Sequence, residues 1–246
     1  MEGTGSIVEI PGPEASEVER IAAAYTLARQ QLAGRQALVR ALLRGEAEAR
    51  AACYGLCAAG PQAMPLLLPL LQHDSPRVRC LSAIALSESS RPCAGLMDAF
   101  ASALQAEKVP AVEAGIMQAL VSVASRARAL EESDVCKRCV ALVLPYLRPV
   151  RSGCTWRGES ACLVVLMAGG LHGDVGHEAT VALMSIWEKT SDPYMASFAE
   201  EVLQRIHRSI PGVLEEIQGD QERRSCEKKL RLGCDQIAAH VPLVSE

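Results

Sequence analysis

Cysteine and histidine side chains at close spacing are the residues of this sequence that could bind a metal. Cys136 and Cys139 form a C-x-x-C pair, and the later candidates are Cys154, Cys162, His172 and His177. A zinc site needs further ligands at suitable spacing, and no second pair completes the set cleanly. Gly173 and Gly176 separate the two histidines, which predicts a turn there. We interpret the C-x-x-C as a core-facing pair on one helix, with a metal or redox role as the alternative.

Enzyme signatures are absent from the sequence. His177-Glu178 begins an apparent H-E-x-x-H, but Val181 stands where the second histidine is required. There is no G-x-S-x-G turn, no P-loop and no dinucleotide glycine pattern. We therefore expect no catalytic residues, no cofactor and no metal, and a non-catalytic protein.

The ten cysteines have three possible roles. The N-terminal residues lack the basic start and the apolar core of a signal peptide, so we expect a reducing, cytoplasmic location. Most cysteines also have the spacing of a helical core, where a free thiol behaves as a small buried hydrophobe. We interpret most of them as structural thiols, and metal ligation or disulfides are the alternatives.

The charge balance argues against a nucleic-acid partner. Lys and Arg total 25 against 29 Asp and Glu, a net charge of −4. A run of arginines lies near the N-terminus, although Glu46 and Glu48 interrupt it: Arg29, Arg35, Arg40, Arg44 and Arg50. Arginine far outnumbers lysine, and its planar fork suits carboxylates and the carboxyl ends of helices. Base composition of the gene would produce the same bias.

One segment is a candidate binding loop. Residues 148–158 interrupt the helical pattern and place three arginines around one of the two tryptophans. Tryptophan and arginine dominate interface hot spots, so the candidate binding residues are Arg148, Arg151, Trp156 and Arg157. The alternative is an ordinary surface loop whose Trp156 packs back on the following helix.

The elements that would position these residues are helices throughout. Only 3% of residues are aromatic, 49% are hydrophobic, and no convincing period-2 segment occurs. Ile21, Ala24, Tyr25, Ala28 and Leu32 have the spacing of one helix face. Pro76, Pro110 and Pro193 each precede the same apolar ladder, and proline is favoured at the first position of a helix. We expect the helix that follows each of these prolines to be the second member of a helix pair. The expected first members are 63–71, 96–104, 140–147 and 181–187, and residues 159–171 supply a further second member.

Helix pairs that recur every 35–45 residues or so are typical of a stacked α-solenoid. The segment from Ala63 to Leu71, followed by Asp74-Ser75-Pro76-Arg77-Val78-Arg79, resembles a HEAT repeat. The resemblance covers residues 62–90 best, is weaker over 93–128 and 176–208, and is only positional over 35–60 and 132–172. It implies that Asp74 and Arg79 occupy the acidic and basic positions that often form a ladder between repeats. The later repeats lack this pair.

These patterns predict an all-α, HEAT/armadillo-like α-solenoid of about five helix pairs. Its expected parts are a flexible leader (1–16), the repeat domain (17–232), which ends in a charged capping helix (214–232), and a tail (233–246). No apolar stretch reaches the roughly 20 residues that span a bilayer, so we expect no membrane partner. The predicted function is a scaffold or adaptor that binds another protein. The alternative is a HEAT-like enzyme or nucleic-acid binder, similar to bilin lyases or DNA glycosylases.

Overall fold

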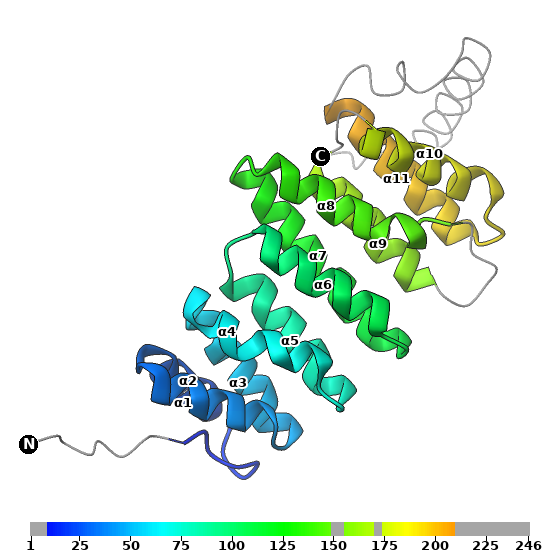
Figure 1. Ribbon diagram of the computed structural model, residues 1–246. Helices are drawn as coiled ribbons and strands as arrows, with labels where there is room; N and C mark the ends of the chain where they lie inside the picture. Colours follow the sequence, from blue (N-terminus) through cyan, green and yellow to red (C-terminus); the bar gives the residue numbers. More distant parts are fainter. Residues whose placement is uncertain (1–8, 149–154, 170–173, 210–246) are drawn as a thin grey trace, which may run out of the picture. The chain divides into compact units, whose positions relative to one another are not determined.

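The computed structural model describes residues 9–148, 155–169 and 174–209 (Figure 1). Every regular element among these residues is helical and none is a strand, which confirms the all-α class. The predicted capping helix (214–232) and tail (233–246) lie outside the described residues. The α-helices are α1 (Glu17–Arg29), α2 (Leu32–Leu42), α3 (Glu46–Ala58), α4 (Met64–Leu67), α5 (Pro76–Ser89), α6 (Ala94–Ala106), α7 (Pro110–Ala129), α8 (Ser133–Val143), α9 (Thr155–Ala168), α10 (Asp174–Lys189) and α11 (Pro193–Ser209).

The chain divides into two compact units, Met1–Cys139 and Val140–Glu246, and the division falls inside α8. In the first unit the odd-numbered helices form one row, in which α1 packs on α3, α3 on α5, and α5 on α7. The even-numbered helices form a second row alongside it. There α2 packs on α3, α4 on α5, and α6 on α7, so successive helices pair in chain order.

Three helices begin at a proline, which confirms the predicted starts of α5, α7 and α11. The residue two positions after each proline begins a buried ladder: Val78, Val112 and Met195. A proline at this point loses no hydrogen bond, because the first amides of a helix have no partner within the helix.

The carboxylate of Asp192 caps the first turn of α11. The Asp192 carboxylate accepts hydrogen bonds from the amides of Tyr194, at 2.9 Å, and Met195, at 3.3 Å. Ser75 occupies the corresponding position before α5, but its side chain makes no capping hydrogen bond. There the imidazole Nδ1 of His73 accepts a bond from the Ser75 amide at 3.0 Å.

The apolar pattern near the N-terminus was misleading. It predicts one helix face from Ile21 to Leu32, but α1 ends at Arg29 and Leu32 begins α2. Tyr25 and Leu32 are 44% and 52% exposed, so the prediction that they join the buried stripe is wrong. A Cβ on Gly34 would lie 2.3 Å from the Leu27 carbonyl oxygen, so the chain turns back tightly at this point.

The proline-rich segment is not the single helix expected over 63–71. Only α4 is α-helical, and 3₁₀ turns, Gly60–Ala63 and Leu68–Gln72, flank it. Pro65 and Pro69 explain the difference, because each removes an amide donor and crowds the preceding turn.

In the second unit α11 packs on both α9 and α10. Helix α9 begins at Thr155, earlier than expected, so the predicted loop over 148–158 is too long at its carboxyl end. His177 lies within α10, which corrects its predicted place in a turn. Gly169 has φ +88° and follows the last residue of α9, so the helix ends here, before the expected boundary at 171.

None of the helices in the described ranges combines the length and the apolar character needed to cross a bilayer.

Candidate interaction surface

The odd-numbered row of the first unit leaves one side uncovered by α2, α4 and α6. Along each helix of the row, exposed or half-buried residues recur every three or four positions, the spacing of one helix face. We call this side the outward face. It is formed by Val18, Ala22, Tyr25 and Arg29 of α1, Arg50, Tyr54 and Ala58 of α3, Arg77, Leu81, Ile84 and Glu88 of α5, and Ala111, Gln118, Ser122 and Ser125 of α7.

Two tyrosines are the largest exposed hydrophobic side chains on the outward face. Tyr25 is 44% and Tyr54 is 46% exposed. Their chain neighbours Ala24 and Gly55 form the close contact between α1 and α3, since a Cβ on Gly55 would lie 2.8 Å from the Ala24 carbonyl oxygen. The two tyrosines therefore occupy matching positions on adjacent helices.

Two of the three arginines on the outward face are already bound to neighbouring groups. Arg50 forms an exposed ion pair with Glu46 at 3.0 Å, one helical turn away. Arg77 donates a hydrogen bond to the carbonyl oxygen of Arg44, near the end of α2. Because Arg50 and Arg77 already have partners, these two side chains favour aromatic and apolar contact on this face more than the binding of a polyanion.

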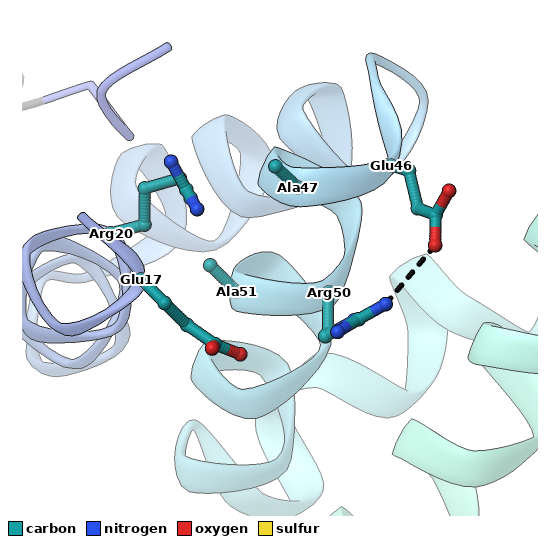
Figure 2. Close-up of a pocket in the computed structure, with 6 residues that line it drawn as sticks. All are labelled: Glu17, Arg20, Glu46, Ala47, Arg50 and Ala51. Carbon is teal, nitrogen blue, oxygen red and sulfur yellow. Dashed lines mark hydrogen bonds and ion pairs between the residues drawn. The ribbon is translucent and has the colours of Figure 1, made fainter. Parts of the chain in front are cut away.

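A shallow pocket lies between the first turns of α1 and α3 (Figure 2). Its volume is about 250 Å³, and its lining residues are Glu17, Arg20, Glu46, Ala47, Arg50 and Ala51. Small-molecule sites are typically about 300–1,000 Å³ and mainly apolar. The charges here are mixed, and Arg20 donates to the backbone carbonyls of Gly12, at 3.2 Å, and Ala15. The pocket is therefore a weak candidate for a ligand site.

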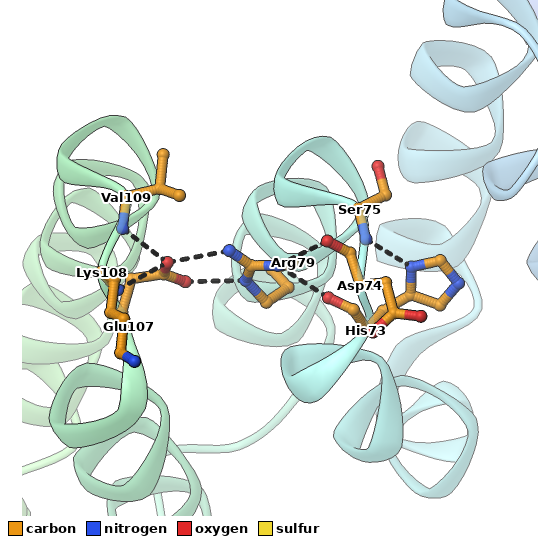
Figure 3. Close-up of polar contacts among 7 residues, drawn as sticks. All are labelled: His73, Asp74, Ser75, Arg79, Glu107, Lys108 and Val109. Carbon is orange, nitrogen blue, oxygen red and sulfur yellow. Dashed lines mark hydrogen bonds and ion pairs between the residues drawn. The ribbon is translucent and has the colours of Figure 1, made fainter.

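Arg79 joins two successive helix pairs (Figure 3). Its Nε and Nη2 donate to the two carboxylate oxygens of Glu107, at 2.7 and 2.8 Å, and its Nη1 donates to the carbonyls of His73, at 2.8 Å, and Asp74, at 2.9 Å. Arg79 belongs to α5, whereas Glu107 lies in the turn between α6 and α7. The arginine thus binds the backbone at Asp74 and the carboxylate of Glu107, a partner that the sequence analysis did not identify.

The two side chains of this pair are only 15% and 3% exposed, Arg79 and Glu107 respectively. The hydrogen bonds from Arg79 lower the pKa of Glu107, and the amides of Val109 and Lys108 lower it further, against the effect of burial. The Glu107 carboxylate in turn raises the pKa of Arg79. Both groups are therefore held in their charged forms.

Other arginines make similar links between helices of the first unit. Arg126 of α7 donates to the carbonyls of Ser87 and, at 3.1 Å, Glu88, at the carboxyl end of α5. Arg138 of α8 donates to the carboxylate of Asp98 in α6. Arginine is thus used here on carboxylates and helix ends, as its planar fork favours.

The predicted loop residues are only partly described. Arg148 is exposed and follows the 3₁₀ turn Leu144–Tyr146, and Arg157 is half-buried in the first turn of α9. Arg151 lies outside the described residues, as does the side chain of Trp156, whose backbone belongs to α9.

The C-x-x-C pair lies on one helix and faces the core, as the sequence predicts. Cys136 and Cys139 of α8 are 3% and 0% exposed, and the Cys139 sulfur lies 3.4 Å from the Met97 sulfur. Burial raises the pKa of both thiols, that of Cys139 to about 12. Across the described ranges, no three His, Cys, Asp or Glu side chains are grouped to hold a metal ion.

The N-terminal arginine run does not form one surface. Arg29 and Arg50 are on the outward face, whereas Arg35 and Arg40 are on α2 in the other row. The Arg35 guanidinium donates a hydrogen bond to the Gln62 side-chain oxygen, and the Arg44 guanidinium lies 3.5 Å from the Glu9 carboxylate.

No family model matches this chain, and neither does any curated protein. Tyr25 and Tyr54 are the candidate binding residues that sequence reasoning missed. Tyr25 has the spacing of the buried stripe, so only the tertiary packing of α1 reveals its exposure.

Proposed function

We propose that the chain is a non-catalytic scaffold or adaptor that binds another protein through the outward face. The observation that carries this proposal is the matching exposure of Tyr25 and Tyr54 on adjacent helices. Tyrosine and arginine are enriched in interface hot spots, and Arg29 and Arg50 lie on the same face. A tyrosine also loses little conformational freedom when it is covered, since it has only two side-chain torsions.

A HEAT-like solenoid is the architecture that we infer for this scaffold. Its support is the chain-order pairing of α2 with α3, α4 with α5, and α6 with α7, together with the row in which α3, α5 and α7 pack in succession. In such repeats each pair contacts only its neighbours, so one face remains extended and available. Within the second unit α10 packs on α11 as a further pair, and the proposal counts about five pairs along the chain.

A reducing, cytoplasmic compartment fits the same proposal. Seven cysteines are free thiols in the part of the chain that the structure describes. Free thiols persist where glutathione and thioredoxin keep them reduced. The test is a thiol count on protein isolated from its native cells under acid quench, and oxidised core cysteines would contradict this location.

The proposed function is tested by affinity capture from native lysate with three forms of the full chain. They are the wild type, the double variant Tyr25→Ala/Tyr54→Ala, and Leu43→Ala as a matched control. Leu43 is also 44% exposed but follows α2, in the other row. We expect one defined protein that the wild type and the control retain at high salt and the double variant loses.

Two results would overturn the proposal. The first is equal capture by all three forms, which would place binding elsewhere. The second is recovery of nucleic acid that is released as salt rises, since phosphate contacts depend steeply on ionic strength.

A further inference from the structure

Two aromatic side chains lie together on the surface of α11, in the second unit. Tyr194 is 54% exposed, and Phe198, one turn later on the same helix, is half-buried. Their rings are nearly parallel, at 10°, with centroids 6.1 Å apart. Phe198 stacks on one face of the Tyr194 ring, so the exposed part of Tyr194 includes the opposite face. An open ring face attracts cations, because the π electrons make it negative.

The packing of α11 turns this pair of rings outward. The helix contacts α9 and α10 through an apolar side on which every residue is at most 2% exposed: Met195, Ala199, Val202, Leu203 and Ile206. Tyr194, Phe198 and Glu201 recur at the three- and four-residue spacing of one helix face. The core of the second unit is therefore complete without the exposed part of Tyr194.

Acidic side chains surround the Tyr194 ring. The Tyr194 hydroxyl donates a hydrogen bond to Oε1 of Glu159, in α9, at 3.0 Å. The Asp192 carboxylate accepts a hydrogen bond from the Tyr194 amide at 2.9 Å. The hydrogen bond to Glu159 raises the pKa of Tyr194, as do desolvation and the charges of Glu159, Asp192 and Glu201. Three carboxylates are therefore close enough to act on one exposed ring.

Two of these carboxylates accept hydrogen bonds from neutral donors only, within the part of the chain that the structure describes. Glu159 accepts from the Tyr194 hydroxyl, and Asp192 accepts from the amides of Tyr194 and Met195. Glu201 differs, because Arg205 forms an exposed ion pair with it one turn later. A carboxylate with neutral donors keeps its whole negative charge, so this surface attracts a cation. We call Tyr194, Phe198, Glu159 and Asp192 the acidic aromatic face.

The combination of a ring with a carboxylate at its edge favours arginine over lysine. A guanidinium group is planar, stacks on aromatic faces and presents its N–H groups in a fork that matches a carboxylate. Glu159 is bound at the hydroxyl edge of the Tyr194 ring through Oε1. Its second oxygen can accept a further hydrogen bond, since a carboxylate has acceptor sites on both oxygens. An ammonium group has no plane with which to stack.

We propose that the acidic aromatic face binds an arginine side chain in a basic segment of another protein. The guanidinium covers the open face of the Tyr194 ring and donates a hydrogen bond to the Glu159 carboxylate. The charge of Asp192 adds to the attraction, and no covalent bond changes. This inference does not rest on the proposed scaffold function, because the outward face belongs to the first unit and the acidic aromatic face to the second.

The first experiment measures peptide binding to the full chain. The probe is a fluorescein-labelled peptide of alternating arginine and glycine, and matched peptides carry lysine or neutral citrulline in place of each arginine. Fluorescence anisotropy is measured at physiological ionic strength, where attraction between distant charges is screened. We expect the arginine peptide to bind more tightly than the lysine peptide, and the citrulline peptide not to bind. Equal affinity for the arginine peptide and either of the others would overturn the proposal.

Tyrosine variants locate the site. Tyr194→Ala removes the ring, and Tyr54→Ala is the matched control, because Tyr54 is 46% exposed but lies in the first unit. We expect Tyr194→Ala to bind the arginine peptide roughly threefold to tenfold more weakly, the loss of a cation–π contact, and the control to bind as the wild type does. Tyr194→Phe keeps the ring and should retain most of the affinity. Equal binding by the wild type and Tyr194→Ala, or a loss in Tyr194→Phe as large as that in Tyr194→Ala, would overturn the stacking. Circular dichroism verifies that each form is folded.

Glutamate variants separate a specific contact from general attraction to an acidic chain. Glu159→Gln and Glu178→Gln each remove one negative charge, and Glu178 is an exposed residue of α10. We expect several-fold weaker binding of the arginine peptide to Glu159→Gln and no change for Glu178→Gln. Equal weakening in both variants would show that the peptide responds to net charge alone, and would overturn the assignment of Glu159.

A second copy of the chain is the competing occupant, because the chain itself contains arginines. Sedimentation velocity of the wild type and Tyr194→Ala over a range of protein concentrations tests this possibility. Sedimentation that is the same in both forms supports a different protein as the partner. Self-association of the wild type that Tyr194→Ala abolishes would overturn that assignment. Capture by Tyr25→Ala/Tyr54→Ala tests the outward face alone, so the two proposals fail separately.

Discussion

Arg79 and Glu107 form a two-point ion pair, with N–O distances of 2.7 and 2.8 Å, between one helix pair and the turn of the next. The arginine also holds two backbone carbonyls at the end of its own helix pair. Because both side chains are largely buried, the removal of either one leaves the other as a buried charge without its ion-pair partner. This pair is therefore a structural link between neighbouring helix pairs, and its loss is measurable.

Arg79→Ala is expected to lower the free energy of unfolding by about 2–4 kcal/mol, the cost of a partly buried charge left without its partner. Urea denaturation followed by circular dichroism measures this change. Arg50→Ala is the control, because the Arg50–Glu46 pair is exposed; exposed pairs contribute about 1 kcal/mol or less. A similar loss in both variants would show that the Arg79–Glu107 link has no special role.

The same link predicts a dependence of stability on pH. Arg79 lowers the pKa of Glu107 in the folded protein below its unfolded value, which is about 4.3. Its contribution is therefore fully present above that value and is lost as the pH falls through the lowered pKa. The stability difference between the wild type and Glu107→Gln should be constant near neutral pH and should shrink between about pH 4.3 and more acidic conditions. A difference that stays constant down to the acid transition would contradict this.

Close helix contact at Gly55 predicts a steric effect. A Cβ at this position would lie 2.8 Å from the Ala24 carbonyl oxygen and 2.7 Å from the Leu38 Cδ2. Gly55→Ala should therefore destabilise the protein by about 1–3 kcal/mol, as overpacking does. Gly95→Ala is the matched control in α6, because no atom lies within 4 Å of the added methyl group. Gly95→Ala should stabilise the protein by up to about 0.5–1 kcal/mol. Thermal unfolding of both variants measures the two changes in stability.

The buried C-x-x-C predicts a packing role without metal. Cys139 is 0% exposed, so Cys139→Ser buries a hydroxyl and should cost about 1–3 kcal/mol. Cys93→Ser, at a half-buried position, should change stability by about 0.5 kcal/mol or less. A strong chelator should leave the Tm of the wild type unchanged. A large drop in Tm on chelation would instead support the metal site that the sequence spacing raised as an alternative.

Local signals in the sequence were sufficient for the fold class and for several helix ends. Pro76, Pro110 and Pro193 begin helices because a proline has a restricted φ and needs no amide partner at that position. Gly169 ends α9 because glycine adopts a positive φ without strain. The C-x-x-C spacing placed both thiols on one buried helix face. Each of these features depends on a few neighbouring residues, so the sequence alone determines it.

The candidate surface and its chemistry depend on residues that are distant in the chain. The apolar spacing assigns Tyr25 to the core, but the packing of α3 and α2 on α1 decides which side of α1 is buried, and Tyr25 is left exposed. The partner of Arg79 comes from the next helix pair. The burial and the electrostatic environment of a residue depend on every element that packs on it. The periodicity within one helix does not identify those neighbouring elements.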